Sequence, residues 1–195
     1  MTYRVESRLP YIQPKNMNEE QRRFYDLHLE AMKPMPYVWI DEEGALNGPS
    51  NLMIHEPDIG NMVFPLNRAI IAKSIKAVGG AVHEVAILVT VAAANAQYGM
   101  YAHTQLARKF GLEEAKITAI LAGRPHQDFS PEEMAAYDLA TALAKPGPIA
   151  GAVYDNCVAV LGQTGVNALT FAIGMFKMIG SILNVYNEPV PEYRR

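Results

Sequence analysis

Apolar residues recur at intervals of three and four along most of this chain, which is the spacing of amphipathic helices. The first such segment follows Asn18, a residue that favours the N-cap position of a helix. Within this segment Phe24, Leu27 and Ala31 fall on one face and form a stripe suited to burial. The pattern predicts a first helix over about residues 19–32.

The middle of the chain is more apolar. A second helix is expected over about residues 57–78, and Pro65 should kink or split it because proline removes an intrahelical hydrogen bond. Residues 82–110 are apolar on almost every side as far as Ala94 and then become amphipathic. This pattern predicts one long helix at the centre of a bundle, with Gly99 as the residue where it would bend.

Four further helices complete the pattern. A short one is expected over 112–122, and Ser130 begins a Ser-Pro-Glu-Glu capping sequence that predicts a helix to about Ala144. Two more are predicted over 151–161 and 164–183, and no stretch alternates like a half-buried strand. We therefore predict an all-α protein, a bundle of about seven helices with an N-terminal helical extension.

Residues 33–56 interrupt the helical pattern with prolines, glycines and the only tryptophan. Such a composition is typical of an ordered irregular loop, and long loops often contribute to a functional site. We therefore divide the chain into an extension over 1–56 and a helical domain over 57–195. Trp39 and Asn51 are the loop residues expected to close over a ligand.

Composition narrows the classes of function. The net charge is −3 and no basic run occurs, which argues against a nucleic-acid partner. The most apolar stretch, Val85–Ala96, is too short to span a membrane. The single cysteine, Cys157, cannot form an internal disulfide, and the N-terminus lacks the apolar segment of a signal peptide. We therefore expect a cytoplasmic protein.

His103 is the side chain best suited to proton transfer near neutral pH. On one helix Ala96, Gly99 and His103 share a face, and the two small residues would leave space for a small ligand beside the imidazole. Tyr98 and Tyr101 would donate hydrogen bonds to a carboxylate or carbonyl oxygen of that ligand, although tyrosines on a bundle helix are commonly packed instead.

Glu84 precedes His103 by nineteen residues. On one straight helix the two would lie about 28 Å apart along the axis, so they could not touch. Contact requires a sharp break near residues 79–84 or at Gly99, or a contribution from a second subunit. The alternative is that Glu84 is only a first-turn acid at a helix N-terminus.

The other histidines give no metal-binding pattern, because none has the spacing of a motif such as His-Glu-x-x-His. By position, His55 and His83 are predicted to be cap or loop residues. His28 and His126 are predicted to lie on the solvated surface. No metal site is expected.

The segment from His83-Glu84 to His103 resembles the carboxymuconolactone decarboxylase and alkylhydroperoxidase D superfamily, over about residues 55–188. In the redox branch of that family two cysteines follow the glutamate, at the positions held here by Ala96 and Gly99. The thiol chemistry of that branch therefore has no nucleophile, and Cys157 is predicted to be a small buried residue. Non-redox members commonly carry Tyr-Glu-Trp-x-x-His, where this chain keeps only the tyrosine and the histidine.

The resemblance implies a helical fold of the alkylhydroperoxidase D type that assembles as a homo-oligomer, a trimer, hexamer or dimer. It also implies a cofactor-independent lyase, isomerase or hydrolase that acts on a small organic acid or lactone from ring cleavage. His103 would be the general acid or base, with Glu84 and Tyr98 as its partners. The alternatives are a catalytically silent ligand-binding or scaffolding oligomer and a peroxidase. A cavity beside His103 would favour the enzyme, and a filled core the scaffold.

Overall fold

The computed structural model describes residues 6–191, and within them the protein is all-α, as predicted. An isolated antiparallel bridge joins Ile40 to Leu46, but the described residues form no strand. The helices are α1 Glu19–Met32, α2 Pro49–His55, α3 Pro57–Val78, α4 Gly80–Ala93, α5 Gln97–Lys109, α6 Glu114–Leu121, α7 Pro131–Ala144 and α8 Gly151–Tyr186, with a short 3-10 turn at Pro14–Asn16.

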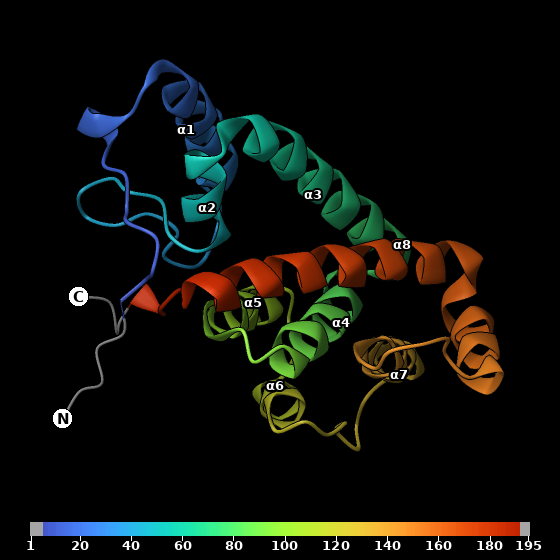
Figure 1. Ribbon diagram of the computed structural model, residues 1–195. Helices are drawn as coiled ribbons and strands as arrows, with labels where there is room; N and C mark the ends of the chain where they lie inside the picture. The colour runs from blue at the N-terminus through green and yellow to red at the C-terminus, as the bar shows by residue number, and fades with distance from the viewer. Residues whose placement is uncertain (1–5, 192–195) are drawn as a thin grey trace.

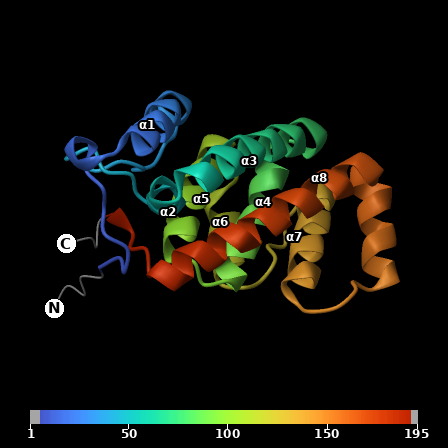
Figure 2. The ribbon, with the colours of Figure 1, turned by 45° about the horizontal axis from the view of Figure 1, so that its top comes forward.

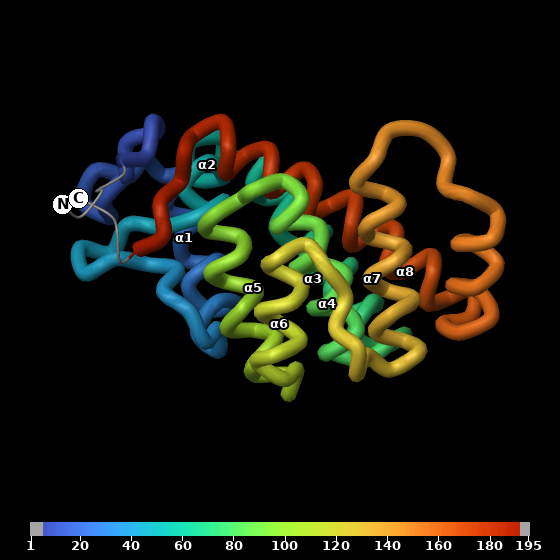
Figure 3. Tube along the Cα trace, turned by 90° about the horizontal axis from the view of Figure 1, so that it is seen from below, coloured from blue at the N-terminus to red at the C-terminus, as the bar shows by residue number. Residues whose placement is uncertain are grey.

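Helix α4 lies at the centre of the fold. It contacts α5, α6, α7, α8 and α3, and every residue from Val82 to Val91 is buried. The reason is its composition, because a helix that is apolar all round is stable only when other helices surround it. Figure 3 shows α5, α6 and α7 arranged along α4, while Figures 1 and 2 show that α3 meets α8 at its C-terminal end and diverges from it toward α2.

The single helix predicted over residues 82–110 is wrong. The chain breaks between α4 and α5 at Asn95, which has a left-handed φ of 51°, a conformation that asparagine tolerates better than most residues. The Ala96 N–H returns to the Val91 carbonyl and closes the end of α4. Gly99 does not bend the helix but lies inside α5, where an added Cβ would lie 3.1 Å from the Val91 side chain.

Helix α3 continues through Pro65, so the predicted split is wrong. Pro65 and Asn61, whose carbonyl loses its partner, are both exposed, and water can therefore satisfy the carbonyl. The helix remains continuous because the missing hydrogen bond lies on its outer face.

Helix α8 contains the two predicted C-terminal segments, joined by a sharp turn at Gly162, where φ is 68° and ψ is 162°. The turn is visible at the right of Figure 1. Within residues 6–191, α8 is the one helix long and apolar enough to cross a membrane, although slightly more than half of its most apolar window is buried against the protein. The core helix of a soluble protein meets the same criterion.

The N-terminal extension packs against α3 and α8. Its first helix begins at Asn18, which forms a reciprocal capping box with Gln21, as Ser130 does with Glu133 at the start of α7. The segment 33–56, predicted as irregular, contains the short helix α2. Packing against α3 stabilises a helix too short to form alone.

Candidate functional site

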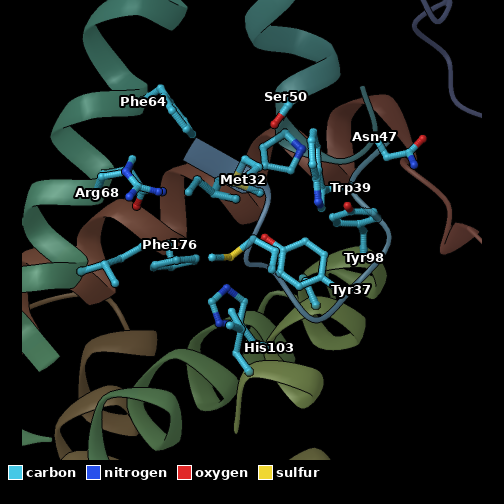
Figure 4. Close-up of a pocket in the computed structure, with 18 of the residues that line it drawn as sticks. Met32, Tyr37, Trp39, Asn47, Ser50, Phe64, Arg68, Tyr98, His103 and Phe176 are labelled. Atoms are coloured by element: carbon cyan, nitrogen blue, oxygen red, sulfur yellow. The ribbon is translucent and has the colours of Figure 1, made fainter. Parts of the chain in front are cut away.

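A cavity of about 260 Å³ lies between the N-terminal extension and helices α3, α4, α5 and α8. Figure 4 shows His103 on one side of this cavity and Ser50, Phe64 and Arg68 on the other. Most of the wall is apolar, and it includes Met32, Met35, Trp39, Met53, Phe64, Ile71, Phe176 and Leu183. The region next to His103 is therefore hollow, as an active site requires.

Glu84 and His103 meet at this cavity. The imidazole Nδ1 lies 2.8 Å from a Glu84 carboxylate oxygen, and both side chains are buried. The break at Asn95 makes this contact possible within one chain, because it turns α5 back along α4. The alternative in which a second subunit supplies the glutamate is not needed, and Glu84 is more than a first-turn acid.

The contact defines the chemistry of the imidazole. A carboxylate accepts a hydrogen bond from Nδ1–H, so the lone pair of the neutral ring is on Nε2. Among the described residues His103 Nε2 has no hydrogen-bond partner, and the ring points into the cavity. The Phe176 ring packs against the imidazole at a nearly perpendicular angle, with the ring centroids 4.6 Å apart. The Glu84 carboxylate thus fixes the orientation of the His103 ring, with Nε2 facing the cavity.

His83 also lines the cavity, so its prediction as a cap or loop residue is wrong. It is fully buried in the first turn of α4, and its Nδ1 lies 2.8 Å from the Ser74 hydroxyl. Burial lowers the pKa of His83 to about 4, against the opposing effect of Glu84. Its Nε2 is buried without a hydrogen-bond partner, 4.0 Å from Glu84.

His28 was predicted on the solvated surface, and this prediction is wrong. The ring is buried between Phe24, Trp39 and Phe64, and its Nε2 lies 2.8 Å from the Ser50 hydroxyl. Burial, aided by the positive charge of Arg68, lowers the pKa of His28 to about 4. The buried face of α1 consists of Phe24, Tyr25, His28 and Met32, whereas Leu27, predicted on the buried stripe, is 52% exposed. The sequence contains a signal for this face, because His28 and Met32 follow Phe24 at intervals of four residues.

Tyr98 and Tyr101 serve a different purpose from the predicted one. The Tyr98 hydroxyl donates to the Val38 carbonyl at 2.9 Å, and the Tyr101 hydroxyl accepts from the Val38 N–H at 3.1 Å. Tyr98 lines the cavity, but Tyr101 is not among the lining residues. Both hydroxyls therefore hold the backbone of the 33–48 loop rather than a ligand.

The remaining predicted residues divide between the cavity and the core. Trp39 and Gly99 line the cavity. Asn51 does not, and its amide donates to the Leu9 carbonyl. Ala96 is fully buried in the core, outside the cavity wall. The hollow therefore lies not beside Ala96 but on the side of His103 that faces the N-terminal extension.

Cys157 is fully buried in the core, as predicted, and its thiol donates to the Ala135 carbonyl. Burial raises the pKa of this thiol, and Asp138 raises it further, so it remains protonated at neutral pH. Among residues 6–191 no group of three or more His, Cys, Asp and Glu side chains is arranged to hold a metal ion.

No protein-family model, curated protein or solved structure matches this chain. Functional conclusions therefore depend on the geometry of the cavity and of the hydrogen bond between Glu84 and His103.

Proposed function

We propose that this protein is an enzyme that uses His103 as a general base and acid on a small, largely apolar organic acid or lactone. The observation that carries the proposal is the 2.8 Å hydrogen bond between Glu84 and His103 at the wall of the cavity. The resemblance to the carboxymuconolactone decarboxylase and alkylhydroperoxidase D superfamily supports the same class of chemistry.

Each member of the pair has a defined role. His103 Nε2 takes a proton from the substrate and later returns it, while Glu84 orients the ring and stabilises the imidazolium. A positioned acid–base group of this kind contributes about 10²- to 10⁴-fold in rate. The predominantly apolar wall strengthens the electrostatic effect of the Glu84 carboxylate on the imidazole.

Arg68 supports an anionic substrate. It lines the cavity and is also exposed to solvent, which places it at the rim. One of its nitrogens donates to the Ala31 carbonyl, and the guanidinium has further N–H groups available for a carboxylate. A molecule with an apolar ring and one carboxylate would satisfy both the wall and the rim.

A ligand-binding protein without catalysis is the second candidate. The observation in its favour is the predominance of apolar side chains in the cavity wall, which suits binding alone. A peroxidase is disfavoured, because the one cysteine is a buried, protonated thiol outside the cavity.

The test is a screen of muconate-type lactones and ring-fission acids in D₂O, followed by NMR for turnover or for exchange of carbon-bound hydrogen. We expect H103Q and E84Q to lower the rate by about 10²-fold or more. His126 lies on the loop before α7, outside the cavity, so H126Q is the matched control. Unchanged turnover by H103Q would refute the proposal, and binding without turnover would favour the ligand-binding protein.

A further inference from the structure

The hydroxyl of Tyr37 faces the cavity and takes no part in the hydrogen bond between Glu84 and His103. Tyr37 lies on the loop between α1 and α2 and lines the same cavity as Glu84 and His103. In Figure 4 its ring lies above the His103 imidazole, with the hydroxyl directed into the middle of the cavity. Among residues 6–191 this hydroxyl has no hydrogen-bond partner, which leaves it available to a bound molecule.

The position of Tyr37 is fixed by its neighbours. The next residue, Val38, is held at both its N–H and its carbonyl by the hydroxyls of Tyr101 and Tyr98. The rings of these two tyrosines also pack edge-on against the Tyr37 ring, each with centroids 6.5 Å away. The predicted ligand-binding tyrosines therefore serve to hold a third one over the cavity.

The hydroxyl of Tyr37 is held as a donor. Burial raises its pKa, and the nearby charge of Glu84 and the proximity of Tyr101 raise it further. The phenol therefore stays protonated at neutral pH. Glu84 makes its hydrogen bond to His103 and none to Tyr37, so the Tyr37 O–H can be donated to an oxygen of the bound molecule.

We propose that Tyr37 is a catalytic residue that donates a hydrogen bond to the carbonyl oxygen of the substrate while His103 takes a proton from the adjacent carbon. The C–H electron pair forms the new C=C bond, the C=O π pair moves to oxygen, and the enolate oxygen is stabilised by the Tyr37 hydroxyl. Return of the proton from His103 restores the carbonyl, so no oxidant or reductant is required. This inference rests on the proposed function and narrows the substrate to a carbonyl compound with a hydrogen on the neighbouring carbon.

The test uses 4-nitrophenol as a mimic of the enolate, and nitrobenzene as the matched compound without the phenol hydroxyl. Transfer of the phenol proton to His103 reproduces the charges of the intermediate, and the phenolate is detected by its absorbance. We expect Y37F to weaken binding of 4-nitrophenol by at least about tenfold, the loss typical of a hydrogen bond to a charged group. Binding of nitrobenzene should change less than about twofold, which shows that the cavity is intact.

Tyr154 provides the matched control, because it lies on α8 outside the cavity, and Y154F should bind both compounds like the wild type. Equal affinity of the wild type and Y37F for 4-nitrophenol would overturn the inference, and so would a lack of binding by both. The two proposals fail separately. Tyr37-dependent binding combined with unchanged turnover in H103Q would sink the acid–base role of His103 and leave Tyr37 as an oxygen-binding residue.

Discussion

Lowering the pH from 7.5 to 5 is expected to destabilise this protein through two buried histidines. The pKa values of His28 and His83 are about 4 in the folded protein, compared with 6.5 for a free histidine. Below pH 6.5 the unfolded chain binds protons that the folded protein does not yet accept. The two neutral imidazoles therefore make their full contribution to the stability of the folded protein above pH 6.5, and this contribution is lost as the pH falls from 6.5 to about 4.

The size of the effect follows from these two pKa values. For one histidine that changes from about 4 to 6.5 on unfolding, the free energy of unfolding falls by about 2 kcal/mol between pH 7.5 and pH 5. If the pH is lowered to 4 and below, the loss in the free energy of unfolding approaches about 3 kcal/mol. Each pH unit between the two pKa values contributes about 1.4 kcal/mol. His28 and His83 together should cost about 4 kcal/mol at pH 5, a large part of the stability of a typical domain.

Urea unfolding of the wild type and H28F at the two pH values isolates one histidine. H28F loses the hydrogen bond to Ser50 and should be less stable at pH 7.5 by about 1–2 kcal/mol. At pH 5 that deficit should shrink by about 2 kcal/mol, because the variant has no buried imidazole to protonate. Leu139 is buried in a different core cluster from the residues around His28, so the deficit of L139A, which leaves His28 in its environment, should be equal at both pH values. A deficit of H28F that is equal at pH 7.5 and pH 5 would refute the assignment of a lowered pKa to His28.

Two further predictions concern the loop and the surface. G48A should lower the free energy of unfolding by about 2 kcal/mol or more, because Gly48 has a φ of 66° and an added Cβ would lie 2.3 Å from the Tyr98 ring. An unchanged urea midpoint would contradict this. We also propose a homo-oligomer formed through the exposed apolar side chains Phe171 and Met62, 69% and 66% exposed. Light scattering should give a multiple of 21.5 kDa for the wild type and a smaller mass for F171E, whereas a wild-type monomer would exclude the oligomer.

Features of the fold that depend on residues close together in the sequence were predicted correctly. The helix starts at Asn18 and Ser130 follow from side chains that cap the backbone three residues away, and both capping boxes are present. The break at Asn95 was not predicted, because apolar residues and alanines continue the helical pattern on its N-terminal side. The structure ends α4 there with a left-handed asparagine and the hydrogen bond from the Ala96 N–H to the Val91 carbonyl. The continuity of α3 through Pro65 was not predicted either, because only the fold shows that the Asn61 carbonyl, which loses its hydrogen bond, faces outward.

The candidate site divides in the same way. His103 and Glu84 were predicted from their residue types and from a spacing that resembles the superfamily's, but their contact depends on the break at Asn95, which was not predicted. Tyr37 was missed altogether, because nothing in a loop sequence shows which side chain points inward. The position of Tyr37 results from the hydrogen bonds that join Val38 to Tyr98 and Tyr101, which lie 60 and 63 residues further along the chain. Contacts of that range are set by the complete fold.

The cavity takes its walls from two parts of the chain. The hydrogen-bonded pair Glu84 and His103 comes from α4 and α5, whereas Tyr37, Trp39 and Ser50 come from the segment before α3. If the cavity binds the proposed substrate, replacing this segment would change the shape of the cavity and leave His103 and Glu84 untouched. A library of grafted N-terminal segments on one unchanged helical body would be a direct route to new specificities.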